Sequence, residues 1–196
     1  MSELNKSKAF FDRLASNWDT NEKSSKESLY KVLEPLRINK GNRVLDIACG
    51  TGIITGIISD ISEASVVGID LSSEMIKIAE NKYKGNKTIS FINEDFLTCP
   101  LSAKFDYAII FNAYPHFTEP ERLASRLSEV LSSGGRAAIV HNIGRRGIRA
   151  CHENVDRAIA RPIGSPAEEA EFFRKLFNID LAREDDFSYY LLMTKK

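Results

Sequence analysis

The sequence lacks long apolar runs, a surplus of charge of either sign and a recognisable leader. No apolar stretch approaches the roughly 18 residues that a membrane-spanning helix requires, and the opening residues, MSELNKSKAFF, lack the basic start and apolar centre of a signal peptide. Lys and Arg number 27, as do Asp and Glu, so no global field attracts a nucleic-acid backbone or an anionic membrane. We therefore expect a cytoplasmic protein with no nucleic-acid partner and no membrane partner.

Cysteine is also scarce, and the sequence shows no repeats, no low-complexity tract and no interdomain linker. Cys49, Cys99 and Cys151 are odd in number and widely spaced, which favours reduced thiols over a disulfide framework or a zinc knuckle. With 196 residues, 43% of them hydrophobic, the chain can bury one good core but hardly two full-sized ones. We expect a single domain over residues 1–196.

Apolar periodicity predicts a regular alternation of helices and strands. Two amphipathic helices are expected first, over 7–18 and 25–38. The expected strands are 43–48, 64–70, 88–93, 105–111, 136–142, 178–184 and 187–196. The expected helices among them are 52–61, 73–83, 120–131 and 165–177, with a further helical segment in the second half of 144–160.

Polar residues mark the expected helix starts. They are Ser72 or Ser73 for 73–83, the capping-box pair Thr118 and Glu121 for 120–131, and the capping-box pair Ser165 and Glu168 for 165–177. Strands joined by crossover helices run parallel, whereas the last two runs, joined by a tight turn, must pair antiparallel. The pattern predicts an α/β fold with a single doubly wound, mostly parallel seven-stranded sheet and an antiparallel C-terminal hairpin strand.

The stretch VLDIACGTG, Val44 to Gly52, ends the first expected strand with a carboxylate and crowds two glycines into three residues. In a doubly wound sheet the ligand lies beyond the carboxyl ends of the strands, so bare backbone at Gly50 and Gly52 permits close approach. A dinucleotide site would need a third glycine where Thr55 stands. Asp46 would repel a pyrophosphate but attract an ammonium or sulfonium. The motif therefore predicts a cationic ligand.

This motif, with VVGIDLSSEMI, NEDF and FDYAIIFNAYPHF further along, resembles the class I S-adenosylmethionine-dependent methyltransferases, near the small-molecule group that includes the ubiquinone and menaquinone methyltransferases. The resemblance covers about Phe10 to Val140. It implies a Rossmann-like methyltransferase fold, S-adenosyl-L-methionine as cofactor and S-adenosyl-L-homocysteine as product. It also implies N-terminal lid helices (1–40), a cofactor-binding core (41–140), and substrate-side helices with the terminal hairpin (141–196).

The resemblance further implies roles for individual residues. Asp46 and the two glycines would surround the methionine end of the cofactor, although the family usually has glycine where Ala48 stands. Asp70 would accept hydrogen bonds from both ribose hydroxyls, because a carboxylate offers two acceptors to two donors. The full set of implied cofactor residues is Asp46, Ala48, Gly50, Thr51, Gly52, Asp70, Leu71, Met75, Asp95, Phe96, Asn112 and Ala113.

Within that set, Leu71 and Met75 would flank the adenine, Asp95 would lie near its amino group and Phe96 against its ring. Asn112 and Ala113 would line the passage between cofactor and acceptor. The opening FFDRLASNWD is similar to the family's lid helix. Its aromatic residues, Phe11 and Trp18, would help to close the pocket, with core packing as the alternative for Trp18.

The three histidines, His116, His141 and His152, fall where the predicted sheet has its carboxyl edge, so they could converge. One reading makes His116 or His141 a general base, with His152 contacting the substrate. A second is a metal site completed by Cys151 or Glu153. A third leaves them as separate polar residues at loop ends. Because no paired ligand spacing stands out, we predict no metal site.

Two further features bear on the acceptor. Tyr114 is a third catalytic candidate, with a packed loop aromatic as the alternative. The segment GRRGIRACHENVDRAIAR is the densest basic stretch of a neutral protein. It is explained either by a solvated helix face or by selection of an anionic acceptor, in which Arg145 and Arg149 would bind a carboxylate or phosphate.

These features predict an enzyme that transfers a methyl group from S-adenosyl-L-methionine to a small-molecule acceptor by in-line displacement, the acceptor being anionic if the arginines contact it. The alternatives are a catalytically silent cofactor-binding scaffold, an NAD(P)-linked reductase and a corrinoid or metal-linked methyl carrier. We expect a monomer or homodimer.

Overall fold

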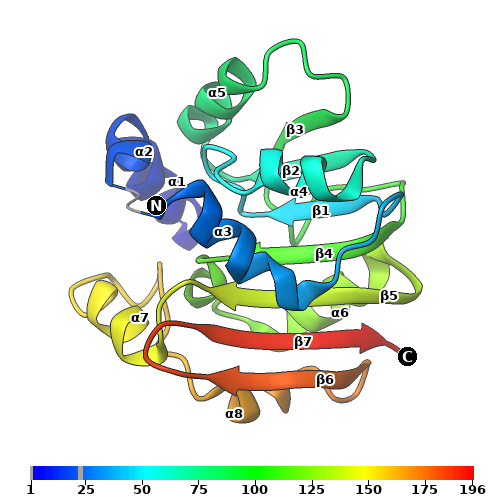
Figure 1. The fold of residues 1–196 in the computed structure, drawn as a ribbon. Helices are drawn as coiled ribbons and strands as arrows, with labels where there is room; N and C mark the ends of the chain where they lie inside the picture. Colours follow the sequence, from blue (N-terminus) through cyan, green and yellow to red (C-terminus); the bar gives the residue numbers. More distant parts are fainter. Residues whose placement is uncertain (1, 22–23) are drawn as a thin grey trace. The chain divides into compact units, whose positions relative to one another are not determined.

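The computed structural model describes residues 2–21 and 24–196, and the chain divides into two compact units, Met1–Pro100 and Leu101–Lys196 (Figure 1). The expectation of one domain with a three-part division stays a prediction. Among the described residues, no helix is both long enough and apolar enough to cross a bilayer.

The first unit alternates helices with three parallel strands. Its elements are α1 (Glu3–Leu14), α2 (Trp18–Asn21), α3 (Lys26–Leu33), β1 (Val44–Ile47), α4 (Thr55–Ser62), β2 (Val66–Asp70), α5 (Ser73–Lys82) and β3 (Ile89–Asn93). The strand order is β3-β2-β1, and Asp70 of β2 pairs in register with Asn93 of β3. Since the three strands are parallel, their carboxyl ends meet at one edge.

Local sequence explains the helices at that edge. α5 begins after Ser72, whose hydroxyl accepts a hydrogen bond from the backbone N–H of Met75, as the sequence predicted. Its apolar residues Met75, Ile76 and Ala79 are buried. α1 is interrupted by a 3-10 turn at Ala15–Asn17, so the expected continuous helix over 7–18 is wrong.

The second unit ends in an antiparallel hairpin. Its elements are β4 (Phe105–Phe111), α6 (Pro120–Val130), β5 (Leu131–His141), α7 (Arg145–Cys151), α8 (Pro166–Ala170), β6 (Phe177–Glu184) and β7 (Tyr189–Lys195). The order is β4-β5-β7-β6, with β4 and β5 parallel and the other two pairs antiparallel. The hairpin of β6 and β7, orange and red in Figure 1, confirms the predicted turn.

Two predictions about α6 and β5 are wrong. The residue at the N-cap position of α6 is Glu119, which makes no side-chain capping bond, because Pro120 takes the first helical position and leaves Thr118 one residue too early. β5 begins directly at Leu131, before the glycines. The register shifts from Phe105 against Leu131 to Tyr107 against Arg136, so the intervening residues are accommodated as an irregularity within the strand.

The segment 144–160 is helical in its first half, as α7, and not in its second half as predicted. The carboxylate of Asp156 accepts a hydrogen bond from the backbone N–H of Ala158, a local turn that competes with helix formation. α8 begins with the predicted capping box of Ser165 and Glu168 but ends at Ala170, well short of the expected residue 177.

Candidate functional site

The loop after β1 turns on three residues with left-handed backbone, Ala48 (φ 54°), Gly50 (φ 55°) and Gly52 (φ 77°). A Cβ atom added at Gly52 would lie 2.9 Å from Cε2 of Tyr83, so only glycine fits there without a shift. Ala48 takes a conformation that glycine adopts more readily, which is the physical reason that glycine suits this position. The loop therefore presents backbone rather than side chains.

Asp70 connects this loop to the start of α5. Its Oδ2 atom accepts from the backbone N–H of Gly50 at 2.8 Å, and its Oδ1 atom accepts from the backbone N–H of Ser72 at 2.8 Å. Burial nonetheless raises the pKa of Asp70, and the negative charge of Asp12 adds to the increase. Each carboxylate oxygen retains a lone pair, so Asp70 can still accept from a ligand diol.

Asp46 lies on buried strand β1 and is only 1% exposed. Its Oδ2 atom accepts from the hydroxyl of Thr55 at 2.6 Å. Burial raises the pKa of Asp46 to about 7. The hydrogen bond from Thr55 lowers this pKa, and the negative charge on Asp70 raises it further. Among the described residues, neither Asp46 nor Asp70 forms an ion pair with a cationic side chain. Two carboxylates without a cationic partner favour the binding of a positively charged ligand.

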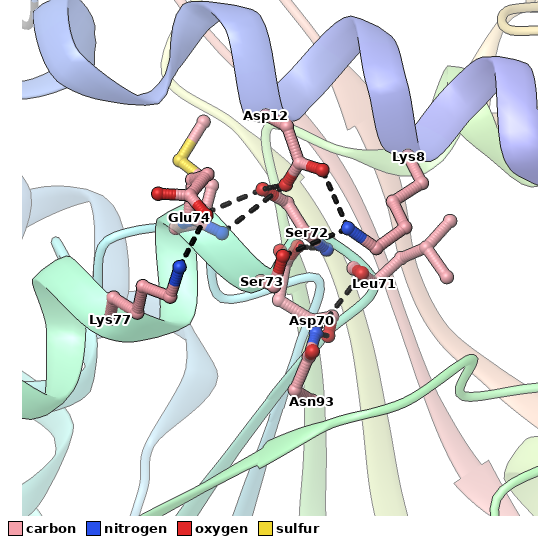
Figure 2. Close-up of polar contacts among 10 residues, drawn as sticks. Lys8, Asp12, Asp70, Leu71, Ser72, Ser73, Glu74, Lys77 and Asn93 are labelled. Atoms are coloured by element: carbon pink, nitrogen blue, oxygen red, sulfur yellow. Dashed lines mark hydrogen bonds and ion pairs between the residues drawn. The ribbon is translucent and has the colours of Figure 1, made fainter.

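The N-terminal helix α1 is anchored to the start of α5 by a polar cluster (Figure 2). Asp12 accepts from the hydroxyl of Ser72 at 2.6 Å and from the backbone N–H of Glu74 at 3.2 Å. Lys8 donates to Asp12 and to the hydroxyl of Ser73, at 2.5 and 2.8 Å. Partial burial raises the pKa of Asp12, but the hydrogen bonds from Lys8 and Ser72 outweigh it and lower that pKa overall.

The same cluster reaches Asp70, because Ser72 contacts Asp12 through its hydroxyl and Asp70 through its backbone N–H (Figure 2). The carboxylate of Asp12 lies at the N-terminus of α5, where unpaired N–H groups favour negative charge. Ser72 thus connects α1 to Asp70, the carboxylate predicted to bind the ribose. The sequence did not predict this role for Asp12 or Ser72, although Asp12 lies in the motif FFDRLASNWD and Ser72 in VVGIDLSSEMI.

The aromatic residues expected in the lid lie beside the loop. Nε1 of Trp18 would be 3.7 Å from a Cβ atom added at Gly50, and the rings of Phe11 and Trp18 stack edge to face with centroids 6.0 Å apart. Asp19 accepts a hydrogen bond from the hydroxyl of buried Thr51. The segment after α1 therefore covers the glycine loop within the first unit.

The remaining predicted cofactor residues of this unit differ in their exposure. Leu71 and Asp95 are half-buried, whereas Met75 and Phe96 are buried. Sδ of Met75 would lie 4.0 Å from a Cβ atom at Gly50, so this side chain also borders the loop. The carboxylate of Asp95 accepts from the backbone N–H of Leu97 at 3.0 Å, which shapes its own turn.

In the second unit, Asn112 and Ala113 follow β4. Asn112 has left-handed backbone (φ 54°), which asparagine tolerates well. Its amide exchanges two hydrogen bonds with Asn142 after β5, donating to Oδ1 at 2.8 Å and accepting from the backbone N–H at 3.1 Å. This pair fixes the carboxyl ends of β4 and β5 to each other, a role that the sequence did not reveal for Asn142.

Tyr114 is fully buried, and its hydroxyl donates to Oε2 of Glu169 at 2.7 Å. Arg161 pairs with the same carboxylate at 2.6 Å and lies over the Tyr114 ring. Burial raises the pKa of Tyr114 far above its ordinary value. Although burial raises the pKa of Glu169, the hydrogen bond from Arg161 lowers it overall. This geometry fits the packed-aromatic alternative for Tyr114 better than a catalytic one.

Two of the three histidines contact each other. Nε2 of His116 lies 3.3 Å from Nε2 of His152, and the ring centroids are 5.0 Å apart. His141, at the end of β5, is 2% exposed, and its Nε2 has no hydrogen-bond partner in the described part of the chain. Burial lowers the pKa of His116 to about 4 and that of His141 to about 3. Both are neutral, weak bases near neutral pH.

The basic segment surrounds a cavity of about 520 Å³, lined by Ile148, Arg149, Ala150, His152, Glu153, Arg157, Arg161, Pro162 and Ile163. Arg149 donates to the carbonyl oxygen of Ile163 at 2.9 Å, and Arg157 is exposed. Arg145 does not line this cavity. Its Nε atom donates to both carboxylate oxygens of Glu184, at 3.1 Å each, and its Nη2 atom lies 3.0 Å from Oε1 of the same residue. Of the two predicted substrate arginines, Arg149 alone borders the cavity.

Part of the chain is similar in sequence to known methyltransferases. Residues 44–135 match a family model described as a methyltransferase domain. The chain is 29% identical over 125 residues to an O-methyltransferase of Pyrenophora dematioidea, covering 62% of this chain and 47% of the relative. It is 29% identical over 110 residues to a demethylmenaquinone methyltransferase of Staphylococcus carnosus, covering 55% and 46%. The chain thus spans about half the length of these curated relatives.

Solved structures match along nearly the whole chain. The complex of DhpI with S-adenosylhomocysteine aligns with a TM-score of 0.77 at 20% identity, covering 98% of this chain and 96% of that one. An S-adenosylmethionine-dependent methyltransferase from Aquifex aeolicus aligns with a TM-score of 0.75 at 18% identity, covering 93% and 98%. The likeness establishes the predicted fold class, a Rossmann-like, mostly parallel seven-stranded sheet with an antiparallel C-terminal hairpin.

Proposed function

We propose that this chain is a class I S-adenosylmethionine-dependent methyltransferase that transfers a methyl group from S-adenosyl-L-methionine to a small anionic acceptor. It matches a methyltransferase-domain model over residues 44–135 and shares the fold of solved S-adenosylmethionine-dependent methyltransferases. The observation that carries the cofactor half of this proposal is the pair of carboxylates, buried Asp46 and half-buried Asp70, beside a loop that exposes bare backbone at Gly50. A dinucleotide with its pyrophosphate would be repelled there, whereas a cation is attracted.

The residues of the first unit fit the cofactor chemically. Asp70 would accept from the ribose hydroxyls, and the backbone around Gly50 and Gly52 would meet the methionine end. Asp46 would act through its charge, since its side chain lies beneath the loop and already holds Thr55. When bound, the sulfonium supplies an activated methyl group, and S-adenosyl-L-homocysteine is the product.

An anionic acceptor agrees with the chemistry of the second unit. The cavity beside α7 is bordered by Arg149, Arg157 and Arg161, and Arg161 is balanced by Glu169. Guanidinium groups suit carboxylate or phosphate oxygens. Such an acceptor needs no general base because it is already deprotonated near neutral pH, which is consistent with the weakly basic His116 and His141. The protein's contribution is then positioning and exclusion of water.

The acceptor class is tested by a labelled-methyl turnover screen over small carboxylates, phosphates and phosphonates, each paired with its neutral ester. We expect turnover with anions and none with the esters. Arg157→Gln should raise KM for the anion about fivefold with kcat little changed. Arg122→Gln, which alters an exposed arginine of α6, should leave both KM and kcat unchanged. Turnover of neutral acceptors alone would contradict the anionic class and leave the cofactor assignment standing.

Trp18 provides a direct readout of cofactor binding, because it is the single tryptophan of the chain and its indole borders Gly50. We expect titration with S-adenosylhomocysteine to change the intrinsic fluorescence of Trp18 in a saturable way. Trp18→Phe should abolish the signal while calorimetry still detects binding. If the fluorescence stays constant while calorimetry detects binding, Trp18 does not lie in the cofactor pocket.

Tyr114→Phe separates a structural from a catalytic role for this hydroxyl. Removing the donor from buried Glu169 is expected to lower the free energy of unfolding by about 1–2 kcal/mol, since Arg161 still pairs with that carboxylate. Urea denaturation measures this loss. We expect kcat to stay within about threefold of the parent; a fall of several orders of magnitude in a folded variant would make Tyr114 catalytic instead.

A further inference from the structure

We propose that His116 and His152 of the second unit form a binding site for a divalent transition-metal ion, of which zinc is the best fit. The proposal starts from the contact between their Nε2 atoms, which lie 3.3 Å apart. From the sequence, a metal site was one reading of the histidines but was not predicted, because no paired ligand spacing stands out between His116, after β4, and His152, after α7.

The other ring nitrogens fix the tautomers. Nδ1 of His116 lies 2.9 Å from the carbonyl oxygen of Ile159, and Nδ1 of His152 lies 2.7 Å from the carbonyl oxygen of Ile148. A carbonyl oxygen only accepts, so each Nδ1 must carry the hydrogen and donate it. In the neutral rings, both Nε2 atoms then present lone pairs to each other. Two facing lone pairs repel unless a proton or a metal cation lies between them.

A bound metal ion resolves that conflict. Ligand histidines almost always donate their second ring N–H to a carbonyl or carboxylate, the arrangement present on both rings here. Two imidazoles bound to a tetrahedral ion at about 2.0–2.1 Å have their Nε2 atoms about 3.3 Å and their ring centroids about 5.2 Å apart. The observed separations are 3.3 and 5.0 Å. Octahedral neighbours at the same bond length would place the nitrogens only about 2.9 Å apart.

The pair supplies two protein ligands and leaves the others open. Within residues 2–21 and 24–196, no group of three His, Cys, Asp or Glu side chains could hold a metal together. His152 lines the cavity beside α7, so water or an acceptor oxygen can reach the ion from that side. The idea that the ion also helps to bind an anionic acceptor rests on the proposed function. Metal binding by the two histidines does not depend on that function.

The chemistry of the ligands sets the metal class. Imidazole nitrogen suits zinc, copper and nickel, whereas magnesium and calcium prefer oxygen. Copper binds such donors more strongly than zinc does, and the separation of the two Nε2 atoms favours a tetrahedral ion. Cys151 is exposed and adjacent in sequence to His152, so its thiol could bind added metal on its own account. The test therefore uses a Cys151→Ser background.

The 196-residue chain, stripped with chelator and dialysed against zinc chloride, is assayed for bound zinc by elemental analysis. We expect one zinc per chain for the parent and for Cys151→Ser, and an affinity at least roughly tenfold lower in Cys151→Ser/His152→Gln. No zinc on the parent, or equal affinity in the His152→Gln chain, would overturn the proposal. Neither outcome depends on methyl transfer, so the proposed function is judged separately.

A second measurement needs no substitution and covers the case in which His152→Gln fails to fold. Histidine side-chain resonances of the parent chain are followed during a zinc titration. The Nε2 resonances of His116 and His152 are expected to shift together, with His141 as an internal reference that moves less. A shift at His141 alone, or at none of the three, would contradict the assignment.

Discussion

Replacing Asp70 with asparagine is expected to weaken binding of S-adenosylhomocysteine about 100-fold. The variant loses the negative charge and one of two acceptor oxygens that would meet the ribose, and each charge-assisted hydrogen bond contributes about 1.5–3 kcal/mol. The new amide N–H₂ would also face the backbone N–H of Gly50 or Ser72, which now donate to the carboxylate at 2.8 Å. Calorimetric titration measures the dissociation constant.

Two further variants separate charge from shape at this position. Asp70→Glu keeps the carboxylate on a longer side chain, so it should restore part of the affinity. Glu80→Gln removes an exposed carboxylate of α5 and should leave binding unchanged. If Asp70→Asn bound S-adenosylhomocysteine as tightly as the parent while remaining folded, the ribose contact would lie elsewhere and the cofactor assignment of β2 would be wrong.

Asp46→Asn is expected to stabilise the fold while weakening the cofactor. Burial raises the pKa of Asp46 to about 7, so the native state loses stability as the pH rises from the unfolded pKa of about 4 to that value, and the penalty is complete above it. Each tenfold shift in proton affinity corresponds to about 1.4 kcal/mol, which gives a penalty of about 2–4 kcal/mol. Asparagine can still accept from the Thr55 hydroxyl and carries no charge.

The sign of the pH dependence follows from the raised pKa. Below the pKa of Asp46 in the unfolded chain, about 4, this residue is protonated in both the folded and the unfolded state, so the parent loses no stability. Between that value and about 7 the unfolded chain loses its proton first, so parent stability falls, and above about 7 the loss is complete. Asp70, Cys49 and Tyr83 are the other titratable groups that interact with Asp46.

Thermal melts of parent and Asp46→Asn as a function of pH test this account. We expect the variant to melt roughly 5–15 °C higher near pH 8 and almost equally near pH 4. Affinity for S-adenosylmethionine should fall in the variant near pH 8, because the cation loses a buried negative charge. Melting curves that differ by the same amount at every pH would mean that Asp46 does not titrate between these values.

The framework of the fold could be predicted because it depends on local pattern. Runs of apolar residues, either alternating with polar ones or continuous, predicted β1 to β5. The tight turn near residue 185 required that the last two strands pair as an antiparallel hairpin. Predictions failed where two local signals competed. Thr118 offered a capping signal, but Pro120 determined where α6 begins. The Asx turn at Asp156 ended the helical pattern that its neighbours favoured.

The candidate site divides in the same way. Asp46, Gly50 and Asp70 lie at strand ends in sequence order, so the pattern alone predicted one edge of the first unit. The contact between His116 and His152, the bonds of Tyr114 with Glu169, and the anchoring of Asp12 to Ser72 join residues 36, 55 and 60 positions apart. No period or motif encodes such pairs, because they depend on how loops pack after the elements have formed.

The central claim is that the carboxylates of buried Asp46 and half-buried Asp70, both in the first unit, attract a positively charged cofactor. S-adenosylmethionine and S-adenosylhomocysteine share every group except the methyl that gives the sulfonium its charge, so their affinity ratio isolates that charge. Calorimetry at about pH 6 and about pH 8 measures the ratio, with NADH as a third ligand. We predict one cofactor per chain, a preference for S-adenosylmethionine that grows as Asp46 ionises, and no NADH binding. A ratio that does not change with pH, or a chain that binds NADH and ignores both sulfur nucleosides, would contradict the account.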